Sequence, residues 1–182
     1  MPPDGGLVPH SRPAVDEDDV QAVAEVLRSG HIAQGAVTRQ FERELAATVG
    51  VRDGVATSSG TAALHLALLA LGVGPGDEVV LPSYTCVALL QAVRCTGATP
   101  RLVDVEPDGY NLSAEEVRRR LTRRTRAVIV PHMFGAPADV TSICALGVPV
   151  IEDIAQALGA TLDGRPLGSF GAVAVCSFYA TK

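Results

Sequence analysis

The chain has 182 residues, of which 47% are hydrophobic and 19% charged, a composition typical of one globular domain with a well-filled core. Its net charge of -5 and the lack of a concentrated basic face argue against nucleic-acid binding. The start of the chain has no signal-peptide pattern, and no apolar run approaches the ~20 residues of a membrane span. We therefore expect a cytoplasmic protein without a membrane partner.

The first 15 residues are rich in Pro and Gly and predict an irregular N-terminal arm, followed by one domain over residues 16–182. A helical pattern runs from Asp16 to Gly30, with acidic residues at its start and glycine at its end, as the helix dipole and the C-cap favour. A second helix is predicted over residues 38–49.

From residue 54 onward, predicted strands and helices alternate. The strands are expected at residues 54–57, 78–81, 100–105, 127–131, 148–152 and 171–177. The helices between them are expected at residues 58–71, 85–95, 113–121 and 139–146, and the first of these is apolar nearly all round, which predicts burial. Continuous apolar strands that alternate with helices indicate an α/β fold, with a mostly parallel sheet covered by helices on both faces.

The four cysteines are Cys86, Cys95, Cys144 and Cys176. None has C-x-x-C spacing or a nearby His, so we predict no metal site. Each lies in an apolar stretch, and buried free thiols are the expectation.

In an open parallel sheet, ligands bind beyond the carboxyl ends of the strands, so the polar residues there are the candidates for function. The first candidate is the run from Ser58 to Ala62, between a strand and a helix. A helix N-terminus with free N–H groups suits a phosphate; Gly60 allows close approach, and Thr61 adds a hydroxyl. The alternative is an ordinary N-cap.

The second candidate is Asp153, which follows a predicted strand and could bind a metal, act as a base or hold a cationic nitrogen. Its alternative is a cap for the next turn. Gln156, three residues further on, could reach the same pocket as a neutral hydrogen-bonding partner.

The third candidate is the run from Ser177 to Lys182. Lys and Arg together number 15, and Lys182 is the only Lys, so it is the one side chain with a primary amine. At the end of a strand we expect it to be partly desolvated, which lowers the pKa of an amine and favours Schiff-base chemistry. The alternative is a solvated tail.

Pyridoxal 5'-phosphate (PLP) requires a phosphate cradle, a carboxylate for its ring nitrogen and a lysine, and the three candidates together supply them.

Many short motifs in this chain resemble the DegT/DnrJ/EryC1/StrS family of PLP-dependent aminotransferases, in order and at matching spacing from about Pro13 to Lys182. They include Ser59-Gly-Thr-Ala-Ala-Leu64, Gly74-Pro-Gly-Asp-Glu-Val79, Gly135-Ala-Pro-Ala-Asp139, Ile151-Glu-Asp-Ile-Ala-Gln-Ala157, Gly168-Ser-Phe-Gly171 and Ser177-Phe-Tyr-Ala-Thr-Lys182. The resemblance implies the large, PLP-binding domain of a type I PLP-dependent transferase.

The resemblance also implies a role for each matching residue. Lys182 is similar to the catalytic Schiff-base lysine, Asp153 to the partner of the pyridine nitrogen, and Gln156 to the residue beside the ring hydroxyl. The phosphate ligands implied are Gly60, Thr61, Ala62 and Ser177.

The implied reaction moves an amino group from an amino acid, with glutamate expected, to a keto sugar nucleotide or a keto-cyclitol, in a homodimer.

Two departures from the family stand out. Many relatives stack an aromatic residue on the PLP ring at the position of Cys86, where either the thiol packs on the ring or Tyr84 substitutes. Family members are also roughly twice as long, so we expect an incomplete large domain with the small domain absent. The alternative function is a truncated, non-catalytic PLP-binding remnant.

Overall fold

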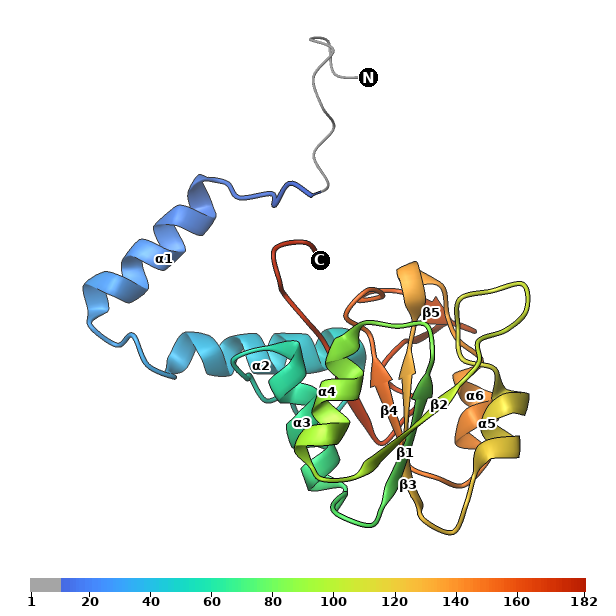
Figure 1. Ribbon diagram of the computed structural model, residues 1–182. Coiled ribbons are helices and arrows are strands. Elements are labelled where there is room, and N and C mark those ends of the chain that lie inside the picture. The colour runs from blue at the N-terminus through green and yellow to red at the C-terminus, as the bar shows by residue number, and fades with distance from the viewer. Residues whose placement is uncertain (1–10) are drawn as a thin grey trace.

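A computed structural model describes residues 11–182, so most of the predicted N-terminal arm lies outside the described residues, and residues 11–16 have no regular structure. The helices are α1 (Glu17–Ser29), α2 (Ala36–Val49), α3 (Gly60–Ala70), α4 (Val87–Cys95), α5 (Ala114–Arg120), α6 (Val140–Cys144) and the short 3-10 helix η1 (Met133–Gly135) (Figure 1). The strands are β1 (Glu78–Pro82), β2 (Thr99–Val103), β3 (Thr125–Pro131), β4 (Val150–Asp153), β5 (Thr161–Leu162), β6 (Arg165–Pro166) and β7 (Val173–Val175).

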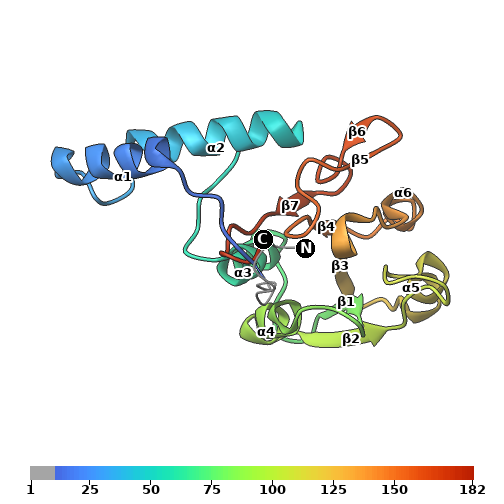
Figure 2. The ribbon, with the colours of Figure 1, turned by 90° about the horizontal axis from the view of Figure 1, so that it is seen from above.

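Five of the strands form one sheet in the order β2-β1-β3-β4-β7, and every neighbouring pair is parallel. Figure 2 shows α3 and α4 on one face of this sheet and α5 and α6 on the other. Each face is sealed by an aliphatic cluster, one built around α3 and α4 and the other around α5 and α6. The predicted α/β fold with helices on both faces is confirmed.

The carboxyl ends of the parallel strands lie along one edge of the sheet. Pro131 at the end of β3 is in register with Asp153 at the end of β4, and Asp153 is in register with Val175 at the end of β7. The segments that follow these three strands therefore meet at that edge, where a ligand site of an open sheet is expected.

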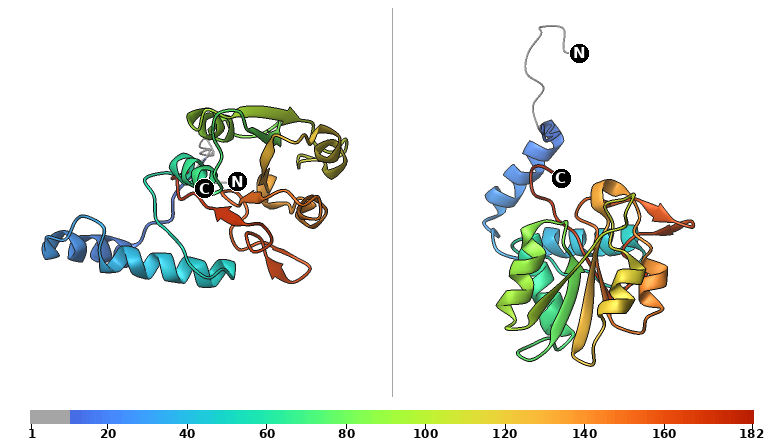
Figure 3. Two further views of the ribbon diagram at one scale, coloured as in Figure 1. Left: turned by 90° about the horizontal axis from the view of Figure 1, so that it is seen from below. Right: turned by 45° about the vertical axis from the view of Figure 1, so that its right-hand side comes forward.

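Helix α1 is specified by its own sequence more than by packing. Asp16 and Asp19 form a reciprocal capping box at its start, and Gly30 closes it in the left-handed conformation with φ of 73°. None of its residues is buried, and both views in Figure 3 show α1 projecting away from the sheet. No helix within residues 11–182 is both long enough and apolar enough to cross a bilayer.

Two predictions about these elements were wrong, and one pair of strands was not predicted. Residues 54–57 form no strand, because no described strand lies beside them to pair with. Helix α3 is not buried all round: Leu66 and Leu69 are 51% and 48% exposed, because only one face of α3 packs on the sheet. The small antiparallel pair of β5 and β6 was not predicted.

Candidate active site

A cavity of about 400 Å³ lies at the carboxyl edge of the sheet, beneath the first residues of α3 and α4. It is lined by six of the seven sequence-predicted site residues: Gly60, Thr61, Asp153, Gln156, Ser177 and Lys182. Ala62 does not line it. Within residues 11–182, no three His, Cys, Asp or Glu side chains are grouped as metal ligands would be.

The N-terminus of α3 forms one wall of the cavity. Ser59 caps this helix, and its hydroxyl accepts the N–H of Ala62 at 3.1 Å. The N-cap interpretation therefore holds for this pair, and the N–H of Ala62 is not free for a ligand. The N–H groups of Gly60 and Thr61 have no acceptor among the described residues, so they are the donors that this helix end can offer an anion.

Residue 60, at the start of α3, lies very close to Ser177 in the segment after β7, which leaves little room for a side chain at residue 60. A Cβ atom at this position would lie 3.2 Å from the Cβ of Ser177 and 3.4 Å from its hydroxyl oxygen. A side chain at residue 60 would thus push apart the helix end and the segment after β7. The close approach places the Ser177 hydroxyl beside the free N–H groups of α3, where both can bind one phosphate.

Asp153 is a buried carboxylate with little compensation. It is 9% exposed, and its Oδ1 accepts the N–H of Ala155 at 3.0 Å. Burial raises the pKa of Asp153 above its ordinary value, against the opposing effects of the Ala155 N–H and the charge of Lys182. No described residue donates a hydrogen bond to its Oδ2. A cationic ligand group would supply the missing partner.

Gln156 and Lys182 reach the cavity from the chain segments after β4 and β7. The Oε1 of Gln156 accepts the N–H of Phe134 at 2.9 Å. Lys182 lies in a turn whose backbone bond runs from its own N–H to the carbonyl of Tyr179 at 2.8 Å. The expected desolvation of Lys182 is not observed, because no described segment covers this turn and the residue is exposed.

Thr85 and Cys86 form the roof of the cavity at the start of α4. The hydroxyl of Thr85 is buried and has no hydrogen-bond partner in the part of the chain that the structure describes, which marks a place where a ligand would be accommodated. Cys86 is exposed and its side chain makes no capping bond to α4. Sequence reasoning did not identify Thr85, since a lone Thr before a helix carries no specific signal.

The prediction of buried thiols was wrong for Cys86 and Cys95, which lie at the two ends of α4 and are exposed. Cys144 and Cys176 are half-buried. Burial, with the nearby charge of Asp153, raises the pKa of Cys176 to about 11.

Sequence reasoning also missed two buried residues, His132, which lines the cavity, and Glu152, which does not. The Nδ1 of His132 accepts the N–H of Ala138 at 3.0 Å, which assigns the ring proton to Nε2, and Nε2 donates to Glu152 at 3.2 Å. Glu152 also accepts the N–H groups of Gly168, Phe170 and Gly171. Although burial alone would raise it, these bonds hold the pKa of Glu152 below its ordinary value.

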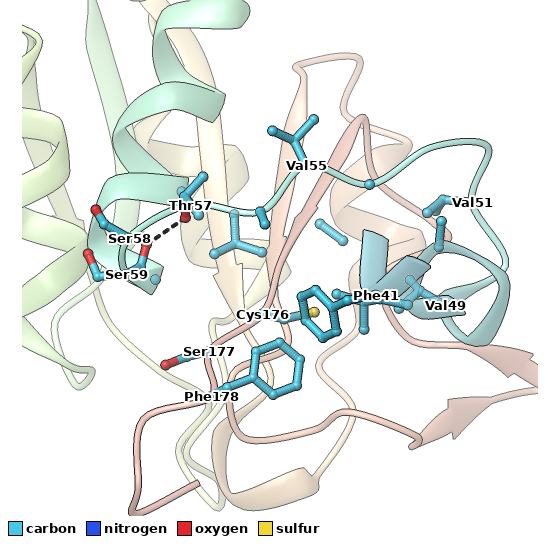
Figure 4. Close-up of a pocket in the computed structure, with 18 of the residues that line it drawn as sticks. Phe41, Val49, Val51, Val55, Thr57, Ser58, Ser59, Cys176, Ser177 and Phe178 are labelled. Carbon is cyan, nitrogen blue, oxygen red and sulfur yellow. Dashed lines mark hydrogen bonds between the residues drawn. The ribbon is translucent and has the colours of Figure 1, made fainter. Parts of the chain in front are cut away.

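A second cavity of about 410 Å³ lies on the other side of β7, between α2, residues 53–57 and the end of β7. Figure 4 shows Phe41 and Phe178 facing each other within it, and their ring centroids lie 5.1 Å apart. The Ser177 hydroxyl points instead toward Ser59 (Figure 4). Neither Asp153 nor Lys182 lines this second cavity, so the reactive side chains gather in the first one.

Solved structures with the same architecture include several aminotransferases. Spr1654 of Streptococcus pneumoniae, provisionally assigned as a sugar aminotransferase and solved in its PLP form, is 31% identical, with a TM-score of 0.93 over 96% of this chain and 50% of its own. The aminotransferase TlmJ of Streptoalloteichus hindustanus is 41% identical, with a TM-score of 0.91 over 97% of this chain and 50% of its own.

DesI, solved in the presence of its TDP-sugar product, is 36% identical, with a TM-score of 0.87 over 98% of this chain and 47% of its own. The chain thus spans about half the length of these solved relatives. The family model for the DegT/DnrJ/EryC1/StrS aminotransferase family matches residues 13–182. With this match over nearly the whole sequence, the chain belongs to the DegT/DnrJ/EryC1/StrS aminotransferase family.

Proposed function

We propose that this chain is the PLP-binding part of an aminotransferase that moves an amino group from an amino acid to a keto sugar nucleotide or a keto-cyclitol. The observation that carries the proposal is the single cavity of about 400 Å³ that Lys182, Asp153 and the N-terminus of α3 all line. An amine, a buried carboxylate and an anion-binding helix end are the three groups that PLP requires of a protein.

Three unpaired groups in the cavity fit this cofactor. The free N–H groups of Gly60 and Thr61, next to the Ser177 hydroxyl, suit its phosphate. The Oδ2 of Asp153 suits a protonated ring nitrogen, which would offset the cost of burying the charge. The buried hydroxyl of Thr85, which also lines the cavity, has no partner among residues 11–182 and could bond to a ligand there.

PLP, when bound, supplies an aldehyde that links to amines and a ring that accepts electrons. The chain's own residues have distinct roles around it. Lys182 holds the cofactor and, once displaced by the donor, takes a proton from the substrate carbon and returns it. Asp153 keeps the ring nitrogen protonated, and Gln156 offers its amide group to the ring oxygen. The N-terminus of α3 and the Ser177 hydroxyl would hold the phosphate end and so position the cofactor relative to Lys182.

The substrates follow from the relatives. DesI, solved with its TDP-sugar product, supports a nucleotide-linked sugar as the acceptor. Glutamate is proposed as the donor from the family resemblance. We propose that residues 16–182 form the N-terminal portion of the large domain, and that the unmatched half of the relatives corresponds to the rest of that domain and a small domain.

A homodimer is part of the same proposal. Helix α1 carries Val20, Val23 and Leu27 on one face, and each is more than half exposed. Such an apolar stripe is typical of a surface that packs against another chain or domain.

The function is tested by one turn of amino transfer. The purified chain is incubated with PLP and excess L-glutamate, and 2-oxoglutarate is quantified against a protein-free control and against Lys182→Met. We expect about one 2-oxoglutarate per chain for the wild type and background levels for the variant. Tight PLP binding without 2-oxoglutarate would contradict the transaminase and favour the non-catalytic remnant. A chain that does not bind PLP at all would refute both.

A further inference from the structure

The turn after β3 holds an uncommon backbone conformation beside the candidate active site. Phe134 has φ of 57° and ψ of 27°, the left-handed region that bulky side chains rarely adopt, and Gly135 follows with φ of 82°. Non-glycine residues in this region persist only where the surroundings hold them, and they are common at functional sites. The contacts that stabilise this turn therefore indicate its role.

The side-chain amide of Asn111 clamps the turn at both ends. Its Oδ1 accepts the N–H of Met133 at 2.9 Å, and its Nδ2 donates to the carbonyl of Ala136 at 3.0 Å. Asn111 itself is anchored by its own carbonyl, which accepts the N–H of Glu106 at 2.9 Å. One amide thus spans the whole turn, and neither Asp nor Leu could make both bonds.

The ring of Phe134 packs against Tyr110, which in turn lies near Tyr84. Tyr110 meets it edge to face with centroids 5.3 Å apart, and Tyr84 lies 6.0 Å from Tyr110. All three rings are about half exposed or more, so their contacts with one another keep the Phe134 side chain in place.

The turn presents the N–H of Phe134 to Gln156. This N–H donates to the Oε1 of Gln156 at 2.9 Å, and Gln156 lines the cavity that Asp153 and Lys182 share. Because the oxygen of the Gln156 amide is occupied, its NH₂ group is the end left for the cavity. No described residue accepts a hydrogen bond from that NH₂ group.

We propose that Asn111 is a positioning residue: through the turn at residues 133–136 it fixes the Gln156 amide with its donor end toward the ring oxygen of bound PLP. The inference rests on the proposed function for the identity of the ligand. Its physical content is that a fixed donor stabilises the anionic form of the ring oxygen and so lowers the pKa of that oxygen. Asn111 touches neither cofactor nor substrate in this account.

The first test needs no cofactor. Amide hydrogen exchange is followed at the Phe134 N–H by NMR in the PLP-free chain. Asn111→Ala and Gln156→Ala should each speed this exchange by about 5- to 10-fold, the factor for one lost hydrogen bond. Ser83→Ala is the matched control, because Ser83 also lies at the carboxyl edge but bonds to Asp104 instead of the turn. Unchanged exchange in Asn111→Ala would overturn the coupling.

The second test uses the PLP-loaded chain and follows the absorption spectrum of the bound cofactor against pH. Losing the donor should move the titration midpoint upward in Gln156→Ala and in Asn111→Ala, and the double variant should shift no further than Gln156→Ala alone. A purely structural role for Asn111 would weaken PLP binding but leave the midpoint unchanged, and that result would refute the proposal. If Asn111→Ala does not fold, Asn111→Asp keeps the acceptor for Met133 but replaces the donor to Ala136 with a charged oxygen.

The two proposals fail separately. A wild-type chain that takes up no PLP refutes the proposed function, while the exchange experiment still tests the link from Asn111 to Gln156. A chain that binds PLP and shows a shifted midpoint in Gln156→Ala but not in Asn111→Ala refutes only the role of Asn111.

Discussion

Two neighbouring carboxylates at the end of β4 differ in how many hydrogen bonds they accept and in the direction of their pKa shifts. Glu152 and Asp153 are adjacent, so the alternation of a strand sends them to opposite faces of the sheet. Glu152 accepts hydrogen bonds from His132 and three backbone N–H groups, whereas Asp153 accepts one, from Ala155. The pKa is lowered at Glu152 and raised at Asp153, each under the same dominant cost of burial.

The difference separates a structural charge from a functional one. A buried carboxylate that the protein itself satisfies holds segments together, here β3, β4 and the turn at residues 168–171. A buried carboxylate left largely uncompensated costs stability until a cation arrives. We propose that Asp153 is a residue of the second kind, at the place where the charge of a ligand would bind.

The largest expected effect is the loss of the Glu152 charge. Gln at this position would turn an NH₂ group toward backbone donors, so Glu152→Gln should reduce the free energy of unfolding by about 3–5 kcal/mol. Urea denaturation measures it. Glu115→Gln, on the surface of α5, is the control and should change the value by less than ~1 kcal/mol. Equal effects of the two substitutions would mean that Glu152 is not the anchor of this face.

The charge of Glu152 should also make the free energy of unfolding depend on pH. The pKa of Glu152 is lowered by folding, so its stabilisation is present above the ordinary value of 4.5 and is lost as the pH falls through the folded-state pKa. The gap in unfolding free energy between wild type and Glu152→Gln should therefore shrink below about pH 4.5. Thr122 and two arginines lower the pKa of Glu78 too, so some acid sensitivity should persist in the variant. A constant gap down to pH 3 would contradict this assignment of charge.

On the other face of the strand, Asp153→Asn should separate stability from binding. The loss of the ring-nitrogen partner should weaken PLP binding by about 2 kcal/mol or more, roughly 30-fold, as measured by titration of cofactor absorbance. The PLP-free variant should nevertheless melt at the same temperature as wild type or a few degrees higher at pH 7, because the uncompensated charge is gone.

The stability gain of PLP-free Asp153→Asn should depend on pH. Folding raises the pKa of Asp153, so the cost of its charge grows as the pH rises from 3.8 through the folded-state pKa, and the advantage of Asn should vanish near pH 3.8 and below. A PLP-free Asp153→Asn chain that is clearly less stable than wild type at pH 7 would place Asp153 with Glu152 as a structural charge.

The smallest effect concerns the thiols. Cys86 and Cys95 are both exposed at opposite ends of α4, but only Cys86 lines the cavity. Both should react rapidly with a thiol reagent at pH 8, and added PLP should slow only Cys86, by a few-fold. Cys176, with a pKa of about 11, should react slowly throughout. Equal protection of Cys86 and Cys95 would indicate that PLP binds elsewhere.

Much of this architecture was predictable from sequence. Apolar strand patterns placed Asp153 at the end of a strand, and the carboxyl edge of a parallel sheet brought it near Gly60 and Lys182. Such features follow from local periodicity and from the topology of parallel sheets. The boundaries of the strand before Lys182 were less reliable: residues 171–177 were predicted, and β7 covers Val173–Val175.

What sequence could not supply are partners from distant parts of the chain. The sequence pattern predicted Glu152 only as one residue of a buried strand. The groups that donate hydrogen bonds to its carboxylate lie 16 to 20 residues away. The clamp of Asn111 on Met133 spans 22 residues, and nothing in the spacing indicates it. The prediction of a strand at residues 54–57 followed local pattern alone, whereas a strand also needs a neighbour to pair with.

Borohydride reduction of the chain in the presence of PLP tests the site most directly, since the only amines available are the ε-amine of Lys182 and the N-terminal amine. Peptide mapping by mass spectrometry should find one reduced cofactor on Lys182 in the wild type and much less in Asp153→Asn. An adduct found only at the N-terminus, or labelling of Lys182 that does not depend on Asp153, would contradict the account.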